Sequence, residues 1–124
     1  MSREDPQTHV LIVSIDATAA GACLVLARAI REWGIPCLVD GRAVRLKKKI
    51  EWAVRMDAFF VVVLGPDDIA AGVAQVKDLD EGSQVAVPIA NVPLHLARQL
   101  LASDEVRRVE LERDVQAFSR PARR

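Results

Sequence analysis

The chain has 124 residues, the usual size of one globular domain, and its 17 basic residues balance its 17 acidic ones. Zero net charge disfavours a protein that coats nucleic acid through bulk positive charge, but it leaves room for a local basic patch. The start of the chain lacks the pattern of a secretory signal, and no apolar run approaches the length of a membrane span. Cys23 and Cys37 form no zinc or disulfide motif, so we expect a cytoplasmic protein with reduced thiols and neither metal nor cofactor.

The first half of the chain predicts a β-α-β unit after a loose arm over residues 1–7. Residues 9–14 form a nearly continuous apolar run, which is typical of a strand buried on both faces. Asp16 is placed to cap a helix that ends before Gly34 and Pro36, and residues 36–39 form the next strand. Two strands joined in this way run parallel. The helix presents a small apolar face, made up of Ala19, Cys23, Leu26, Ala27 and Ile30.

The second half predicts one more helix and strand, then a hairpin. Residues 44–56 form a helix whose apolar stripe is Leu46, Ile50 and Ala53, and residues 59–64 form a buried strand. A short helical turn over 67–71 leads to two alternating strands, 73–77 and 84–87, whose loop suits an antiparallel hairpin. A helix follows Asn91, and another is expected from Ser103 to about Phe118. We therefore expect a domain over 8–102 and a helical tail over 103–124.

Basic residues are concentrated in one short segment that contains no acid. This segment is typical either of a surface that contacts phosphates or of a solvated helix face. Its members are Arg42, Arg45, Lys47, Lys48 and Lys49.

Trp52 is predicted to lie off the apolar stripe of its helix, with Met56 beside it. An indole in that position can stack on a base, anchor a partner protein or be covered by a neighbouring element. Because large apolar side chains left in water tend to mark an interface, this pair favours a homodimer.

Nothing in the sequence indicates an enzyme. His9 and His95 have no nucleophile or carboxylate at a recognisable catalytic or metal spacing, and no glycine-rich phosphate-binding loop follows a strand. We therefore expect no catalytic residues and no metal site.

Residues 8–101 resemble the anticodon-binding domain of class II aminoacyl-tRNA synthetases, most closely that of histidyl-tRNA synthetases. The resemblance is carried by the order of its motifs: the front half VLIVSID and LARAIREWGIPC, a basic helix containing Ala53, the strand 59–64, Gly65 with Asp68 three positions later, Gly72, a strand ending in Lys77, then Asp78-Leu79 and Gly82. It implies an α/β fold in three layers, with a mixed five-stranded sheet flanked by helices. It also implies that Asp68 and Lys77 contact anticodon bases.

The same resemblance leaves two functions open, because the ATP and amino-acid motifs of a class II synthetase are absent from these residues. One is a non-catalytic tRNA-binding module, either free-standing or a fragment of a synthetase. The other is an interaction or dimerisation module that pairs with itself or with a synthetase-like protein and has lost RNA recognition.

Overall fold

The structure is a computed structural model that describes residues 9–102. The chain divides into two compact units, residues 1–93 and 94–124. The first unit is built on a five-stranded sheet with the strand order β2-β1-β3-β4-β5. Its elements are β1 (Val10–Ser14), α1 (Ala20–Glu32), β2 (Cys37–Asp40), α2 (Leu46–Arg55), β3 (Phe60–Leu64), α3 (Pro66–Ala71), β4 (Val73–Asp78) and β5 (Gln84–Pro88), with short 3-10 turns at Ala17–Ala19 and Ile89–Asn91.

The sheet is mixed, as predicted. The central strand β1 runs parallel to both β2 and β3, whereas β4 runs antiparallel to β3 and forms an antiparallel hairpin with β5. The predicted strands and helices agree with these elements to within two residues at each end, except that α1 begins three residues later than predicted, because a 3-10 turn capped by Asp16 precedes it. The predicted fold class is therefore confirmed.

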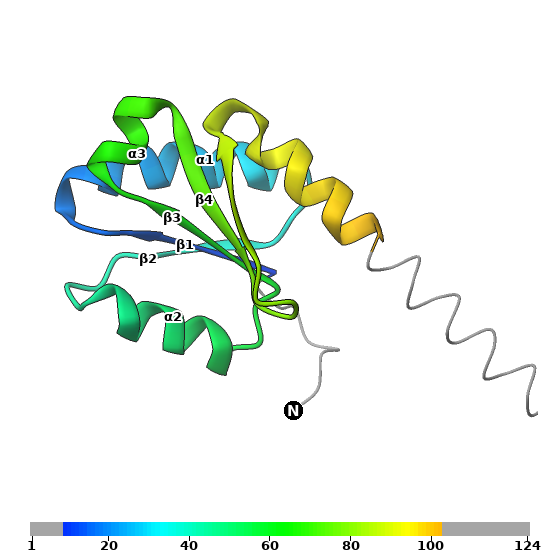
Figure 1. The fold of residues 1–124 in the computed structure, drawn as a ribbon, viewed down its shortest axis with the longest axis horizontal. Coiled ribbons are helices and arrows are strands. Elements are labelled where there is room, and N and C mark those ends of the chain that lie inside the picture. The colour runs from blue at the N-terminus through cyan, green and yellow to red at the C-terminus, as the bar shows by residue number, and fades with distance from the viewer. Residues whose placement is uncertain (1–8, 103–124) are drawn as a thin grey trace, which may run out of the picture. The chain divides into compact units, whose positions relative to one another are not determined.

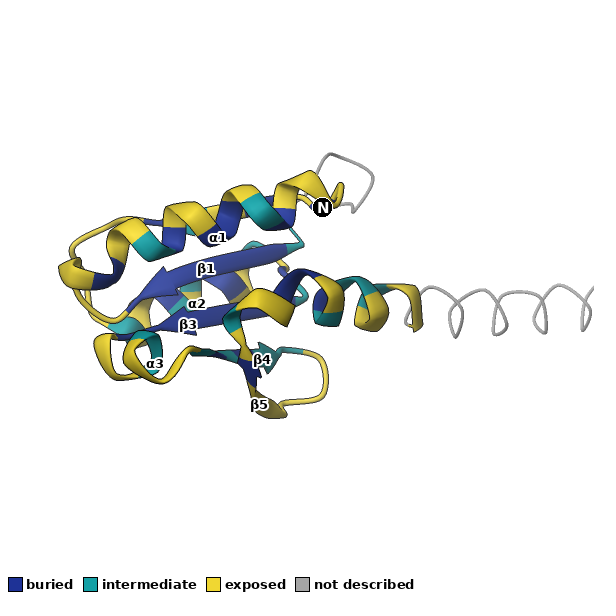
Figure 2. Cartoon of the chain, turned by 90° about the horizontal axis from the view of Figure 1, so that it is seen from above, coloured by how far each residue is buried: buried dark blue, intermediate teal, exposed yellow. Residues whose placement is uncertain are grey.

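Helices cover both faces of the parallel part of the sheet, with α1 on one face and α2 on the other (Figure 1). Every residue of β1 and of β3 is buried, which explains why both strands read as continuous apolar runs. The helix α1 turns its buried side toward the sheet and its exposed side away from it (Figure 2). Its five predicted core residues are all buried.

The helix α2 buries a different side from the one predicted. Its buried residues are Lys49 and Ala53, and at about 100° per residue these two lie midway between two apolar pairs. All four flanking side chains are partly buried against one core cluster: Leu46 and Ile50 on one flank, Trp52 and Met56 on the other. The prediction that Trp52 and Met56 lie off the core is therefore wrong, because a wheel built from apolar residues alone leaves out Lys49.

The helix predicted after Asn91 is present over residues 92–102, with Pro93 in its first turn. It continues into the second unit. The predicted arm over 1–7 and the predicted tail over 103–124 lie outside the described residues. Within residues 9–102, no helix is long and apolar enough to cross a membrane.

Candidate nucleic-acid interface

The hairpin strands present polar side chains on the face of the sheet that α2 covers elsewhere. Lys77 lies opposite Val61 in the β3–β4 pairing, and Val61 belongs to the core cluster packed against α2. Directly paired residues point to the same side of a sheet, so Lys77 and its neighbour two positions away, Gln75, share that side. Gln84 of β5 pairs with Lys77 and adds a third polar side chain. Gln75, Lys77 and Gln84 are here called the β4–β5 face.

Asp68 is tied to the β4–β5 face by a hydrogen bond. In α3, its carboxylate accepts the backbone N–H of Gly65 at 3.2 Å and the side-chain amide of Gln75 at 3.2 Å. Gly72 then takes the left-handed conformation, with φ 75°, that turns the chain directly into β4. Of the two residues implied by the resemblance, Lys77 therefore belongs to the β4–β5 face itself, and Asp68 is held to that face through Gln75.

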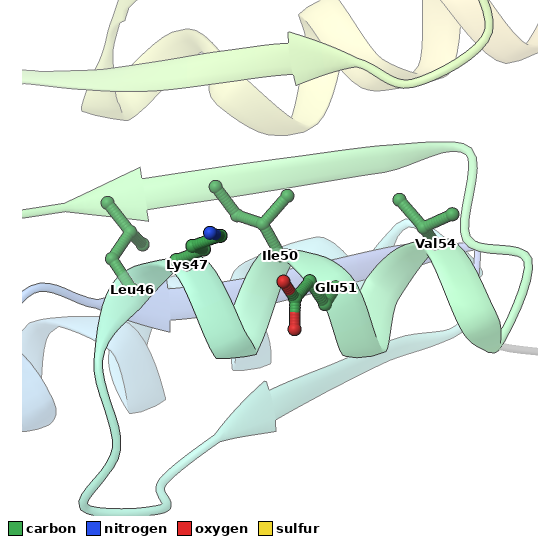
Figure 3. Close-up of a pocket in the computed structure, with 5 residues that line it drawn as sticks. All are labelled: Leu46, Lys47, Ile50, Glu51 and Val54. Atoms are coloured by element: carbon green, nitrogen blue, oxygen red, sulfur yellow. The ribbon is translucent and has the colours of Figure 1, made fainter.

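An open apolar groove lies along α2 on the flank away from β2. Leu46, Ile50 and Val54 point from the helix toward β3, and Lys47 and Glu51 complete the lining (Figure 3). Because β3 lies between β1 and β4 in the sheet, this is the flank nearest the β4–β5 face. The apolar side chains that α2 leaves accessible are therefore on the opposite flank from Trp52.

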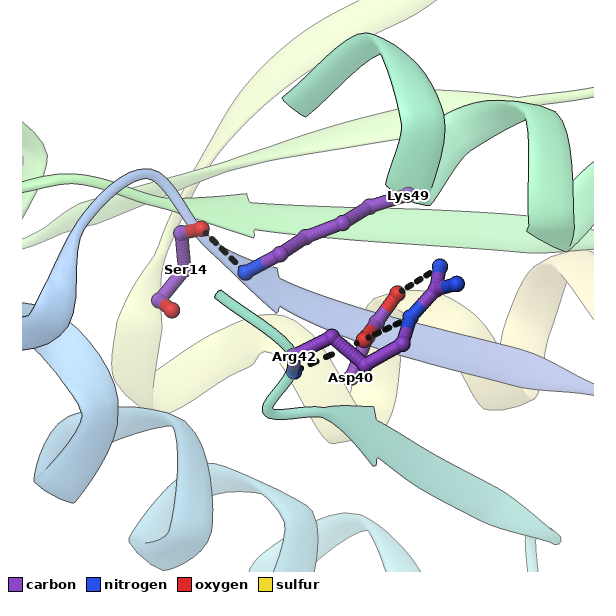
Figure 4. Close-up of polar contacts among 4 residues, drawn as sticks. All are labelled: Ser14, Asp40, Arg42 and Lys49. Carbon is purple, nitrogen blue, oxygen red and sulfur yellow. Dashed lines mark hydrogen bonds and ion pairs between the residues drawn. The ribbon is translucent and has the colours of Figure 1, made fainter. Parts of the chain in front are cut away.

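Arg42 is already paired within the chain. Its guanidinium donates two hydrogen bonds to the buried carboxylate of Asp40, at 2.9 and 2.8 Å (Figure 4). These bonds hold the pKa of Asp40 below its usual range. The same guanidinium lies 4.8 Å from the centre of the Trp52 ring, a cation–π contact. A role for Arg42 in RNA binding therefore stays a prediction. In such a role Arg42 would contact RNA while its guanidinium stays bound to Asp40.

Lys49 does not belong to a solvated or phosphate-facing surface. Only 3% of it is exposed, and its Nζ donates to the backbone carbonyl of Ser14 at 3.1 Å (Figure 4). The expectation that the whole basic segment faces outward is corrected at this residue. A buried ammonium needs acceptors, and the end of β1 supplies one.

The remaining basic residues lie at the first turn of α2 and are exposed. Arg45 is the N-cap residue, and Lys47 and Lys48 follow it, with no acidic residue in the first turn. The amino end of a helix carries partial positive charge, so cations there are unfavourable to the helix. The arrangement favours a negatively charged ligand at this end of α2. The part of the chain from residue 9 to 102 holds no group of three or more metal-ligating side chains.

A family profile described as "Anticodon binding domain" matches residues 7–99. The chain belongs to this family. The histidine–tRNA ligase of Symbiobacterium thermophilum is 33% identical over 93 residues, which cover 75% of this chain and 22% of that protein. The ligase of Gluconacetobacter diazotrophicus is 39% identical over 88 residues, which cover 71% and 21%. The chain thus spans about a fifth of the length of the curated relatives it matches.

Solved structures agree with the fold. The histidyl-tRNA synthetase of Nostoc sp. PCC 7120 superposes with a TM-score of 0.74 at 25% identity, covering 77% of this chain and 23% of that one. The RNA-binding domain of the Cryptosporidium parvum threonyl-tRNA synthetase has a TM-score of 0.68 at 15% identity, which is a likeness of fold.

Two polar residues of this anticodon-binding domain were not assigned to the site from the sequence. Gln75 and Gln84 join Asp68 in one chain of hydrogen bonds. An available signal was the alternation in β4, where Gln75 and Lys77 alternate with the buried Ala74 and Val76. The position of Asp68 over that strand depends on the α3 turn, which residue spacing does not reveal.

Proposed function

We propose that this anticodon-binding domain binds tRNA through the β4–β5 face, Asp68 and the basic first turn of α2. The observation that carries the proposal is the hydrogen-bonded placement of Asp68 at the β4–β5 face of a chain that belongs to the anticodon-binding family. The family match supports the ligand class, and the relatives named histidine–tRNA ligase favour histidine tRNA among tRNAs. We further propose that the protein acts in the cytoplasm.

The chemistry of these groups suits RNA. A carboxylate such as that of Asp68 accepts hydrogen bonds from base amino and imino groups, while the Lys77 ammonium donates to base acceptors or phosphates. Bases in a loop are unstacked, so their edges are open to such contacts. Arg45, Lys47 and Lys48 supply charge for the backbone without fixing sequence.

Titration of total tRNA in a gel-shift assay, at about 50 and 200 mM salt, tests this proposal. Phosphate contacts release bound cations, so affinity is expected to fall steeply between the two salt concentrations. The control is Arg28→Ala, an exposed residue of α1 on the opposite face of the sheet, and its affinity should equal that of the wild type. Absence of a shift at the lower salt concentration would contradict RNA binding.

We propose that the domain has no catalytic activity of its own. The chain matches about a fifth of the synthetase relatives, and residues 9–102 place no candidate nucleophile or acid–base pair at the β4–β5 face. Pyrophosphate exchange with ATP should stay at background with histidine or with any other amino acid. Exchange by the pure chain, dependent on an amino acid, would overturn this part of the proposal.

A second candidate function, self-association, is favoured by the apolar groove on α2. We take a second copy of the chain as its occupant. Lys47 and Glu51 line the same groove, so two helices related by a two-fold axis bring Lys47 of each copy toward Glu51 of the other. Trp52 and Met56 stay a predicted contact on the opposite flank. Binding of a synthetase-like protein is the alternative occupant, and it predicts a monomeric chain when pure.

A further inference from the structure

We propose that Gln75 is a positioning residue that orients the Asp68 carboxylate, and that Gln75 and Gln84 determine which base the β4–β5 face accepts. This inference rests on the proposed binding of RNA and deepens it. The ligand class is an unstacked nucleobase of a single-stranded loop. Neither glutamine carries charge, so their contribution is to base selection more than to overall affinity.

The hydrogen bonds run in one direction across the hairpin. The Gln75 amide nitrogen donates to Asp68 Oδ1 at 3.2 Å, and the Gln84 amide nitrogen donates to Gln75 Oε1 at 3.4 Å. An ionised carboxylate can only accept, so Asp68 fixes which end of the Gln75 amide faces it. The Gln75 carbonyl then faces Gln84 and fixes that amide in turn. The charge on Asp68 thereby sets the order of donors and acceptors along this row of three side chains, Asp68, Gln75 and Gln84.

Gln75 also fixes the carboxylate itself. The second oxygen of Asp68, Oδ2, is held by the backbone N–H of Gly65 at 3.2 Å. With one oxygen held by each donor, the plane of the carboxylate is fixed between α3 and β4. Without Gln75, only Gly65 holds it and the group can rotate about its side chain. A recognition group discriminates between bases only when its direction is fixed.

The row leaves unused atoms that match a base edge. Each carboxylate oxygen has an acceptor position left, each glutamine nitrogen has a second N–H, and the Gln84 carbonyl is left as an acceptor by this chain of bonds. Lys77, directly opposite Gln84, adds a cation. Adjacent donors and acceptors of this kind read a base by two contacts at once, and they reject a base whose pattern is reversed.

The test is a double-mutant cycle on base discrimination. Fluorescence anisotropy measures binding of the anticodon stem-loop of histidine tRNA and of stem-loops in which each anticodon base is replaced in turn. Gln75→Leu should reduce the preference between the best and worst loops by about tenfold, the range of one two-contact base pair. In an Asp68→Ala background, the effect of Gln75→Leu on the preference should be smaller than in the wild type, because the part that passes through Asp68 is already lost.

Controls separate this inference from folding and from the proposed function. Gln99→Leu removes an exposed amide from the helix of residues 92–102 and should leave the preference unchanged. Gln75→Thr, whose branched side chain suits a strand, serves if the leucine variant fails to fold. If the wild type binds no loop, both proposals fail. If the wild type discriminates and Gln75→Leu discriminates equally well, or if Gln75→Leu has its full effect in the Asp68→Ala background, RNA binding stands and the positioning role of Gln75 is overturned.

Discussion

The ammonium group of Lys49 lies 3.1 Å from the backbone carbonyl oxygen of Ser14 and joins α2 to the last residue of β1. Asp40, at the end of the adjacent strand β2, is also buried. Its pKa is lowered mainly by the hydrogen bonds from Arg42, and the positive charge of Lys49 adds to the effect. Two cations therefore stabilise one buried carboxylate at the ends of β1 and β2.

The same substitution at two neighbouring lysines of α2 should have very different effects on the stability of the fold. Lys49→Met leaves the Ser14 carbonyl without its buried donor, so we expect the free energy of unfolding to fall by about 1–3 kcal/mol. Lys48→Met, at an exposed position one residue earlier, should change it by less than about 0.5 kcal/mol. Urea unfolding followed by circular dichroism compares the two. Equal effects would show that the Lys49 contact does not stabilise the fold.

Removing the guanidinium of Arg42 should destabilise the fold in a pH-dependent way. The folded pKa of Asp40 is lower than its unfolded value, so the pair stabilises the protein fully above about pH 4 and loses this effect as the pH falls further. Arg42→Met should lower the urea midpoint at pH 7 and lower it less at pH 3. Arg45→Met, at an exposed N-cap position, is the control. A difference that is the same at both pH values would argue against the Asp40 pairing.

The sequence pattern was sufficient to predict the elements and the sheet, because β1 and β3 are apolar except for Ser14 at the end of β1, and because Gly34 and Gly72 follow α1 and α3. It failed at α2 for a physical reason. Lys49 points inward because its ammonium group donates to the buried backbone carbonyl of Ser14 at the end of β1, and no periodicity of apolar residues reveals that contact. Assigning lysine to the solvent shifted the apparent core stripe and made Trp52 look exposed.

The candidate site was also predictable only in part from the sequence. The resemblance to the anticodon-binding domain implied Asp68 and Lys77 as contact residues, and the order of the elements places them in α3 and β4. The hydrogen bond from Gln75 to Asp68 could not be predicted in this way, since the two residues meet only after Gly72 turns the chain from α3 into β4. Pairing of Arg42 with Asp40 depends likewise on the loop after β2, so a run of basic residues cannot show which of them is free to bind phosphate.

Both thiols should be unreactive in the folded protein. Cys23 and Cys37 are buried, and burial raises the pKa of each to about 11. At pH 8 about one thiol in a thousand is then ionised, against about a quarter for an exposed cysteine. A colorimetric disulfide reagent should react slowly with the native protein and rapidly in urea. Because the unfolded thiols ionise first, stability should also fall as the pH rises above about 8.5. Rapid labelling of the native protein would contradict this burial.

Removing a basic side chain at the proposed interface should weaken RNA binding and also reduce its salt dependence, because both effects follow from the loss of a phosphate contact. Lys77→Ala, Lys47→Ala and Lys48→Ala should each lower affinity for tRNA by about 1–3 kcal/mol at most and reduce the slope of log affinity against log salt by about one. Asp68→Ala should alter the preference between anticodon loops more than the average affinity. Titrations at four salt concentrations measure both quantities. Unchanged slopes in all three lysine variants would show that these residues contact no phosphate.

Self-association through α2 should depend on the centre of its groove. Ile50 lies between Leu46 and Val54 among the lining side chains, and Val54 is 59% exposed, an unusual position for a large apolar residue. Across a two-fold axis the same row serves both copies, so one substitution places two like charges at the contact.

Ile50→Glu should therefore shift a dimer to a monomer in light scattering at matched concentration. Because Ile50 also touches the core cluster, its thermal midpoint is measured in parallel, and Val54→Glu, at a more exposed lining position, gives the same test with less loss of stability. The control is Val25→Glu on α1, where a residue 72% exposed lies on the other face of the sheet. If the wild type is monomeric at all concentrations, a second copy of the chain does not occupy the groove, and its occupant is a different protein or none. If the dimer persists in both groove variants, the groove is not the dimer contact, and the flank of α2 that carries Trp52 becomes the candidate contact.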